Sequence, residues 1–277
     1  MDPISKELSY TLRTETQRKP KSDEYISSDG LIYCSKCNTP KQYVDDILGL
    51  CPVMCRCEKQ RQEDKEKRAA EKSRLQAVEK LRCAAFSDIQ SRNCTFAVDD
   101  GKDPIASKIA KSYVENWAEM KKHARGLLLL GSVDTGKTFI TCCIANALID
   151  NGVSVYVSTV RQLLNNYSNY KIRDSLLSKI RDCSLFIIDD LGTELNNEKN
   201  NDMLFDIIDT RYRSDKPLIV TTNLSPQELK NPELGRERLY SRIIEKCTPI
   251  KINGVHRRYL LGEENAKRTM ELLGLKY

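Results

Sequence analysis

The segment Gly-Ser-Val-Asp-Thr-Gly-Lys-Thr, residues 131–138, has the spacing of a phosphate-binding loop. Its glycines let backbone amides turn toward phosphate oxygens, and a helix that begins after the loop adds a favourable dipole. In this pattern the ammonium group of Lys137 reaches the β- and γ-phosphates, and the hydroxyl of Thr138 binds Mg²⁺. We therefore predict a site for ATP and Mg²⁺ formed by Gly131, Ser132, Val133, Asp134, Thr135, Gly136, Lys137, Thr138 and Phe139.

Asp134 stands at a position where many loops of this type carry glycine. Aspartate tolerates left-handed backbone better than most residues do. Its negative charge near the phosphates should nonetheless weaken nucleotide binding or speed nucleotide exchange. This is a hypothesis about nucleotide affinity and leaves the prediction of the fold unchanged.

Two aspartates directly follow the apolar run Leu185–Ile188, which predicts a buried strand that ends in carboxylates. After a phosphate-binding loop at this separation, we expect Asp189 to hold Mg²⁺ or its water shell. Asp190 is expected to polarise the attacking water. Glu194 is a further candidate, although a plain surface glutamate is an equally good interpretation.

Three polar positions farther along the chain are candidates to complete such a site. Asn223 follows another apolar strand and is expected to orient the water, the alternative being an ordinary turn residue. Arg238 and Arg242 are four residues apart and share one face of a helix. One of them is expected to reach the γ-phosphate of a neighbouring subunit, the alternative being two solvated arginines. Arg257 or Arg258 is a candidate for a further phosphate contact.

A separate chemistry is indicated by five cysteines between residues 34 and 57. Cys34 and Cys37 have the spacing of a metal knuckle, and four thiolates make a closed tetrahedral Zn²⁺ site. The spacing leaves open which two of Cys51, Cys55 and Cys57 complete the set. The module is too small to be stabilised by a hydrophobic core, and metal binding would therefore supply its folding energy. We expect it to hold a partner protein or DNA.

Alternating apolar runs and helical patterns must position these residues. Strands are expected at Gly126–Leu130, Val153–Val157, Leu185–Ile188, Leu218–Thr222 and Pro249–Ile252. Helices are expected over residues 58–82, 105–122, 137–150, 160–181 and 199–213. This alternation predicts an α/β fold with a parallel sheet covered by helices on both faces.

The chain of 277 residues carries a formal net charge of +6, which permits contact with a polyanion without requiring one. The first 20 residues hold no apolar stretch, and Leu127–Leu130 is far too short to span a bilayer, so we expect a cytoplasmic protein without a membrane partner. Four segments are expected: a polar lead-in (1–30), a zinc-binding module (31–57), a charged linker helix (58–92) and an ATPase domain (93–277).

Four stretches in this order, GSVDTGKT, LFIIDDLGTE, IVTTN and RLYSRI, resemble the AAA+ P-loop ATPases of the DnaC/DnaI helicase-loader group. The same group includes the IstB-type ATPases of insertion-sequence transposons. The resemblance covers residues 95–260 approximately. It implies ATP hydrolysis, with Asn223 as sensor 1, Arg242 as the arginine finger and Arg238 as the second candidate. It also favours Cys55 and Cys57 as the second pair of zinc ligands.

The same resemblance implies partners for this chain. They are the hexameric replicative helicase, single-stranded DNA and further copies of the chain. Residues 161–181 occupy the place of a helical insertion associated with single-stranded DNA, so Arg161, Tyr167, Tyr170, Lys171 and Arg173 become candidate DNA contacts. An ordinary amphipathic helix is the alternative. Two other functions stay open: a transposition ATPase of the IstB type, and a nucleotide-gated adaptor with negligible hydrolysis.

Overall fold

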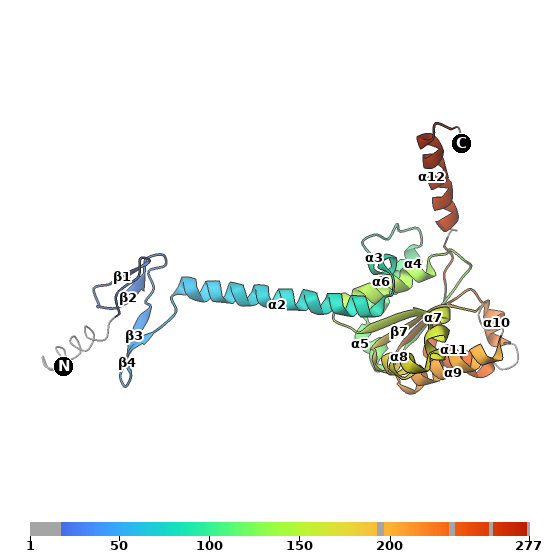
Figure 1. Cartoon of the computed structure of the whole chain (residues 1–277), viewed down its shortest axis with the longest axis horizontal. Helices are drawn as coiled ribbons and strands as arrows, with labels where there is room; N and C mark the ends of the chain where they lie inside the picture. The colour runs from blue at the N-terminus through green and yellow to red at the C-terminus, as the bar shows by residue number, and fades with distance from the viewer. Residues whose placement is uncertain (1–17, 193–196, 233–235, 255–256, 276–277) are drawn as a thin grey trace. The chain divides into compact units, whose positions relative to one another are not determined.

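The computed structural model describes residues 18–192, 197–232, 236–254 and 257–275. The chain divides into two compact units, Met1–Leu75 and Gln76–Tyr277 (Figure 1). Among the described residues, none of the helices combines the length and the apolar character that crossing a bilayer requires.

The N-terminal unit contains two small antiparallel sheets. Strand β1 (Glu24–Ile26) pairs with β2 (Ile32–Cys34), and β3 (Gln42–Asp45) pairs with β4 (Gly49–Pro52). Strand β1 lies ahead of the predicted module boundary at residue 31. The reason is the buried carboxylate of Glu24, whose ionic partners fasten this part of the predicted lead-in to the module.

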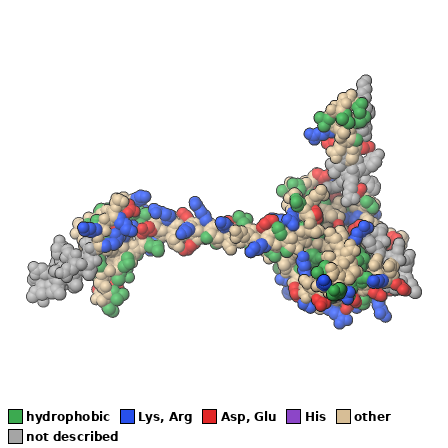
Figure 2. All heavy atoms as spheres, viewed as in Figure 1, with side chains coloured by type: hydrophobic (Ala, Val, Ile, Leu, Met, Phe, Trp, Pro, Cys, Tyr) green, Lys and Arg blue, Asp and Glu red, His purple; other side chains and the backbone are tan. Residues whose placement is uncertain are grey.

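Helix α2 (Arg56–Ala85) spans the predicted helix over residues 58–82. It contains no glycine or proline, and its side chains are exposed throughout residues 59–77. Lys, Arg, Asp and Glu side chains are spread along it (Figure 2). Its last turns differ, because Val78 and Leu81 pack against the core of the C-terminal unit and Ala85 is buried there.

The linker helix ends before the predicted residue 92. Asp88 accepts a hydrogen bond from the Ser91 amide (2.7 Å) and starts the separate helix α3 (Ile89–Asn93). Phe86 is buried in the core of the C-terminal unit, so that unit begins ahead of the predicted boundary at residue 93.

The C-terminal unit is built on a five-stranded parallel sheet in the order β6-β7-β8-β5-β9. The fold class predicted from the sequence is therefore confirmed. The strands are β5 (Gly126–Leu130), β6 (Val155–Thr159), β7 (Leu185–Leu191), β8 (Leu218–Thr222) and β9 (Cys247–Lys251). The helices are α4 (Pro104–Glu115), α5 (Trp117–Lys122), α6 (Lys137–Asp150), α7 (Val160–Ser168), α8 (Tyr170–Asp182), α9 (Glu198–Arg213), α10 (Pro226–Lys230), α11 (Glu237–Lys246) and α12 (Arg257–Leu272).

Two predicted helices are each divided in two. The helix expected over 105–122 is broken at Asn116, between α4 and α5. The helix expected over 160–181 is broken at Asn169, whose side chain accepts a hydrogen bond from the Lys171 amide and so caps α8 (3.1 Å). Asparagine favours such caps because its side chain replaces a backbone hydrogen bond.

Helices cover both faces of the sheet, and the side chains of β5 alternate between the two layers. Leu128 and Leu130 face a cluster that contains residues of α7, α8, α9 and α11. Leu127 and Leu129 face a second cluster with residues of α4 and α6. All five residues of β5 are buried, as expected for the central part of a parallel sheet.

Helix α6 is fastened to the end of α2 by a buried amide. The side chain of Asn146 donates hydrogen bonds to the carbonyls of Ser91 (2.9 Å) and Cys94 (2.8 Å). Its oxygen accepts one from Arg82 (3.2 Å), and Arg82 also pairs with Asp150. The helix that follows the phosphate-binding loop is thereby tied to the last turns of α2.

Candidate nucleotide site and candidate metal centre

Polar residues meet in a pocket of about 440 Å³ at the carboxyl edge of the sheet. Strand β8 lies between β7, which carries the aspartates, and β5, which leads into the phosphate-binding loop. Ligands of open α/β sheets bind at this edge. The pocket is lined by Val133, Asp134, Thr135, Gly136, Lys137, Thr138, Phe139, Thr159, Asp189, Asp190, Thr221 and Asn223.

The backbone of the loop shows why its glycines are needed. Gly136 has φ +91°, a left-handed conformation that leads into the first turn of α6. At Gly131 an added Cβ would lie 2.6 Å from the carbonyl oxygen of Ile252, too close for any other residue. Asp134 also has a positive φ, +66°, so the aspartate occupies a conformation that glycine would adopt more readily.

Lys137 is buried and bonds to its own loop. Its Nζ donates to the carbonyl oxygens of Gly131 (2.9 Å) and Ser132 (2.7 Å) and to Oδ1 of Asn223 (2.6 Å). Burial lowers the pKa of the Lys137 ammonium, and nearby carboxylates, first that of Asp190, act in the opposite direction. The ammonium thus lies among oxygen acceptors that phosphate oxygens can replace.

Thr138 and Asp189 lie side by side, as required of two ligands to one cation. The Thr138 hydroxyl donates to both carboxylate oxygens of Asp189, at 3.0 and 2.9 Å. Burial raises the pKa of Asp189, while hydrogen bonds from Thr221 and Thr138 lower it. A hydroxyl beside a buried carboxylate is a set of hard oxygen donors, which suits Mg²⁺.

Asp190 and Asn223 form a second pair in the same pocket. The Asn223 amide donates to Oδ1 of Asp190 (3.1 Å), while the oxygen of that amide accepts from Lys137. Asp190 is exposed and has φ +61°. The amide therefore links the carboxylate expected to polarise water with the lysine expected to bind phosphate.

Thr221 and Thr159 also line this pocket, and the sequence analysis did not identify either of them. Thr221 is 1% exposed and is followed by Thr222, the last residue of β8, and then by Asn223. A signal was present, because two adjacent threonines at the end of an apolar strand place a hydroxyl on each face of the sheet.

The candidate arginine finger lies outside the residues that line the pocket. Arg242 pairs with Asp209 of α9 (2.6 Å) and its guanidinium lies 4.3 Å from the Phe205 ring centroid. Arg238 is exposed on the same helix, α11. Glu194 falls outside the described residues. Arg257 and Arg258 open α12, and their side chains are likewise not described.

The insertion at residues 161–181 divides its candidate DNA contacts. Arg161, Tyr170 and Lys171 are exposed, Tyr170 at 75%. Tyr167 is instead buried and donates a hydrogen bond to Asp206 (2.6 Å), and Arg173 stacks on its ring at 4.7 Å. Tyr167 therefore supports the packing of α7 on α9 and is not placed to stack on a base.

The thiols of Cys34, Cys37, Cys55 and Cys57 meet in the N-terminal unit, all within 4.8 Å of one another. The Sγ atoms of Cys34 and Cys57 are 3.5 Å apart, and those of Cys55 and Cys57 are 3.3 Å apart. A hydrogen bond with Thr39 lowers the pKa of Cys37 to about 5, which favours the thiolate. Four thiols at this spacing match the ligand set of a structural zinc site.

Cys51 lies on strand β4, opposite Tyr43, and does not belong to this cluster of four. The arrangement brings together the four cysteines that the family resemblance favoured. The spacing of the cysteines alone did not decide which two of Cys51, Cys55 and Cys57 join Cys34 and Cys37.

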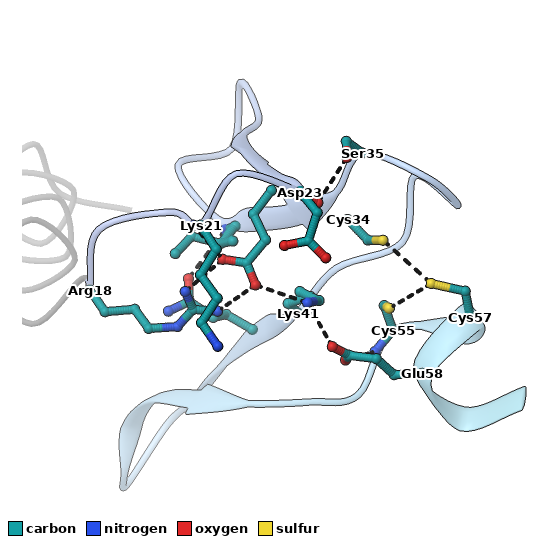
Figure 3. A network of polar contacts seen from close by, with 12 residues as sticks. Arg18, Lys21, Asp23, Cys34, Ser35, Lys41, Cys55, Cys57 and Glu58 are labelled. Atoms are coloured by element: carbon teal, nitrogen blue, oxygen red, sulfur yellow. Dashed lines mark hydrogen bonds and ion pairs between the residues drawn. The ribbon is translucent and has the colours of Figure 1, made fainter. Parts of the chain in front are cut away.

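An ionic network supports the cysteine cluster (Figure 3). Glu24 accepts hydrogen bonds from Arg18 (2.6 and 2.8 Å) and from Lys41 (2.9 Å), and Lys41 also pairs with Glu58 (2.7 Å). The Arg18 guanidinium, with help from the Lys21 amide and Lys41, holds the pKa of Glu24 well below its usual range. Buried charges need such partners to offset their desolvation.

Curated relatives of this chain include replicative helicase loaders and chromosomal replication initiator proteins DnaA. The replicative helicase loader DnaI of Bacillus subtilis (strain 168) is 28% identical over 185 residues, 60% of this chain and 58% of that protein. The replicative helicase loader DnaC of Escherichia coli (strain K12) is 26% identical over 161 residues, 55% of this chain and 63% of that protein. The chain thus spans less than two thirds of the length of either relative.

Solved structures share the fold. A crystal structure of DnaI matches with a TM-score of 0.55 at 24% identity, over 64% of this chain and 98% of that chain. The DnaC helicase loader matches with a TM-score of 0.50 at 20% identity, over 60% of this chain and 100% of that chain. The model of the IstB-like ATP binding proteins matches residues 56–260. The chain belongs to this family of AAA+ ATP-binding proteins.

Proposed function

We propose that this protein is an ATP-dependent loader of the hexameric replicative DNA helicase. Its C-terminal unit binds ATP and Mg²⁺, hydrolyses ATP, associates with further copies of the chain and grips single-stranded DNA. Its N-terminal module and α2 bind the helicase. The observation that carries the ATPase part is one pocket that holds Lys137, the pair Thr138–Asp189 and the pair Asn223–Asp190.

Phosphoryl transfer to water needs mainly positioning and charge stabilisation. Lys137 exchanges its carbonyl acceptors for the β- and γ-phosphate oxygens. Thr138 and Asp189 would hold Mg²⁺, which neutralises charge on the phosphates when bound. Asp190 accepts a proton from the attacking water, and Asn223 orients that water while it holds the Asp190 carboxylate.

Arg242 is proposed to serve the ATP of a neighbouring copy, with Arg238 as the second candidate. Its present partner, Asp209, also pairs with Arg213 (2.6 Å). If Arg242 leaves, the Asp209 carboxylate therefore keeps one cation beside it. Release of Arg242 does not leave the Asp209 carboxylate without an ionic partner, so the free-energy cost of breaking this pair is low.

Two observations support the proposed helicase contact. Among the matched relatives are proteins named replicative helicase loaders. The hairpin of β3 and β4 in the N-terminal module exposes apolar side chains, with Ile47 at 92% and Leu48 at 76% (Figure 2). Exposed apolar surface of this kind marks interaction sites. We assign the module a zinc ion at Cys34, Cys37, Cys55 and Cys57, which would hold this hairpin in place.

Size-exclusion chromatography with the replicative helicase, with and without ATP and Mg²⁺, tests the proposal. Co-elution is expected for the full chain, and it should be lost when the N-terminal unit is removed. That truncation should begin at Gln76, so that Val78 and Leu81, which pack in the core of the C-terminal unit, are kept. The truncated chain should still bind ATP, which controls for its folding.

Absence of a complex under every nucleotide condition would overturn the loader proposal. The family description would then favour a transposition ATPase of the IstB type, which should prefer duplex DNA and form filaments with ATP. A turnover assay separates either enzyme from an adaptor with negligible hydrolysis. Wild-type turnover should exceed that of Asp190→Asn by about 100-fold or more. Equal turnover would point to an adaptor.

A further inference from the structure

Strand β7 carries one residue more than its neighbour β8 at the pocket. Ile188 lies opposite Val220, and the next paired residue, Leu191, lies opposite Thr222. Asp189 and Asp190 therefore face the single residue Thr221. Two residues against one make a β-bulge, which redirects the side chains of the longer strand. Asp190, at φ +61°, is the left-handed residue of this bulge.

The hydroxyl of Thr221 holds both residues of the bulge. Its oxygen accepts a hydrogen bond from the Asp190 amide (2.9 Å), and the hydroxyl donates to Oδ1 of Asp189 (2.7 Å). A hydroxyl has one proton. Since the amide supplies the proton of the first bond, the proton of Thr221 is free to point at Asp189. The direction of both bonds is thereby determined.

From these contacts, and resting on the proposed ATPase function, we propose that Thr221 is a positioning residue for Mg²⁺-dependent hydrolysis. It aims the Asp189 carboxylate at the Thr138 hydroxyl, and it holds the Asp190 backbone so that the Asp190 side chain faces the pocket. Thr221 is 1% exposed, so water does not compete for its hydroxyl. Its effect on hydrolysis is therefore exerted through Asp189 and Asp190.

The chain offers a matched control in the adjacent residue. Thr222 is equally buried, and its hydroxyl also makes two hydrogen bonds, to the Leu191 carbonyl (2.6 Å) and from the Leu224 amide (3.1 Å). Neither bond involves an aspartate of the pocket. Thr221→Val and Thr222→Val therefore remove the same group from the same strand, and both keep the shape of the side chain.

The test is a Mg²⁺ titration of ATPase activity for the full chain and its variants. In Thr221→Val the Mg²⁺ concentration for half-maximal activity should rise about 10-fold to 100-fold, as for the loss of a residue that supports a metal ligand. Thr221→Ser, which keeps the hydroxyl, and Thr222→Val should stay within about twofold of the wild type by comparison with that range. Equal Mg²⁺ requirements in Thr221→Val and Thr222→Val would overturn the proposal.

Two further measurements distinguish a wrong role for Thr221 from misfolding of the variant and from a lack of ATPase activity in the wild type. If Thr221→Val does not fold, as judged by circular dichroism, Thr221→Ala is carried through the same titration. If the wild type hydrolyses no ATP, the proposed enzymatic function fails. Binding of a fluorescent ADP analogue then decides the role of Thr221: Mg²⁺ should strengthen binding to the wild type and not to Thr221→Val. If Mg²⁺ strengthens binding equally in both proteins, the proposed role of Thr221 is refuted.

Discussion

Single side chains of the nucleotide pocket are already paired with one another. Lys137 bonds to Asn223, and Asn223 bonds to Asp190, so one amide joins the cation of the pocket to its exposed carboxylate. Asp134 is the residue of the loop that departs from the usual pattern. It has a left-handed backbone, and its carboxylate is among those that oppose the lowering of the Lys137 pKa by burial.

Replacing Asp134 should strengthen ATP binding, because a negative charge near the phosphates is removed. We expect Asp134→Asn to lower the dissociation constant about fivefold, which corresponds to about 1 kcal/mol of charge repulsion. Asparagine also tolerates left-handed backbone, so this variant separates charge from conformation. Isothermal titration calorimetry measures the change, with Asp134→Gly as the second variant. Unchanged affinity in both variants would remove the charge argument.

The residues of the pocket differ in how far the sequence alone predicts them. Lys137, Thr138 and Asp189 were predicted because a loop pattern and a nearby apolar strand are local signals. Thr221 was not, because its two bonds depend on a register shift between β7 and β8 that no local pattern contains. Tyr167 was a candidate DNA contact because the family resemblance places a helical insertion at residues 161–181. In the structure it is buried and donates a hydrogen bond to Asp206, 39 residues away in the sequence.

At the scale of elements, strand identity was easier to predict than helix continuity. The predictions Gly126–Leu130 and Leu218–Thr222 have the bounds of β5 and β8, and Leu185–Ile188 lies within β7, because each contains an apolar run. Val153–Val157 starts two residues before β6, and Pro249–Ile252 starts two residues after the beginning of β9. The breaks at Asn116 and Asn169 were missed because the apolar spacing continues across them. Linker and module boundaries shifted because Glu24 and Phe86, both outside the expected cores, are buried.

The position of α11 leads to a prediction about subunits. If Arg242 acts on the ATP of a neighbouring copy, Arg242→Ala and Lys137→Ala should each lose ATPase activity, the arginine variant by about 10³-fold. Mixing the two should restore part of it, because the intact pocket of one meets the intact arginine of the other. Activity is measured on the mixture and on each variant at equal total protein.

Arg213→Ala controls for disturbance of α9, since Arg213 shares Asp209 with Arg242. It should retain activity close to that of the wild type. A mixture no more active than its components would argue that Arg242 acts within its own chain. If Lys137→Ala regains activity when mixed with Arg238→Ala but not when mixed with Arg242→Ala, Arg238 is the residue that acts on the neighbouring ATP.

For the whole molecule, the two units should respond separately to loss of metal. We expect the purified full chain to contain about one zinc ion, as a four-thiolate site requires. Removing it with a chelator should unfold the N-terminal module, because metal binding supplies folding energy there. ATP binding by the C-terminal unit should persist. Zinc content by atomic absorption and thermal unfolding followed by circular dichroism measure both effects.

Cys51→Ser is the matched control for this experiment, since Cys51 lies outside the group of four thiols. It should keep the zinc, whereas Cys37→Ser should lose it. Equal zinc content in both variants would refute the assigned ligand set. If Cys51→Ser loses zinc and Cys37→Ser keeps it, Cys51 is a zinc ligand and Cys37 is not.

The buried amide of Asn146 has a consequence for motion. Helix α6 begins at Lys137, so any displacement of α6 when phosphate binds is passed through Asn146 and Asp150 to Arg82. Amide hydrogen exchange over residues 78–85 should therefore slow when ATP and Mg²⁺ are added, as local opening becomes more costly. The same amides should not respond in Lys137→Ala. In this way the end of α2 would register whether the pocket is filled.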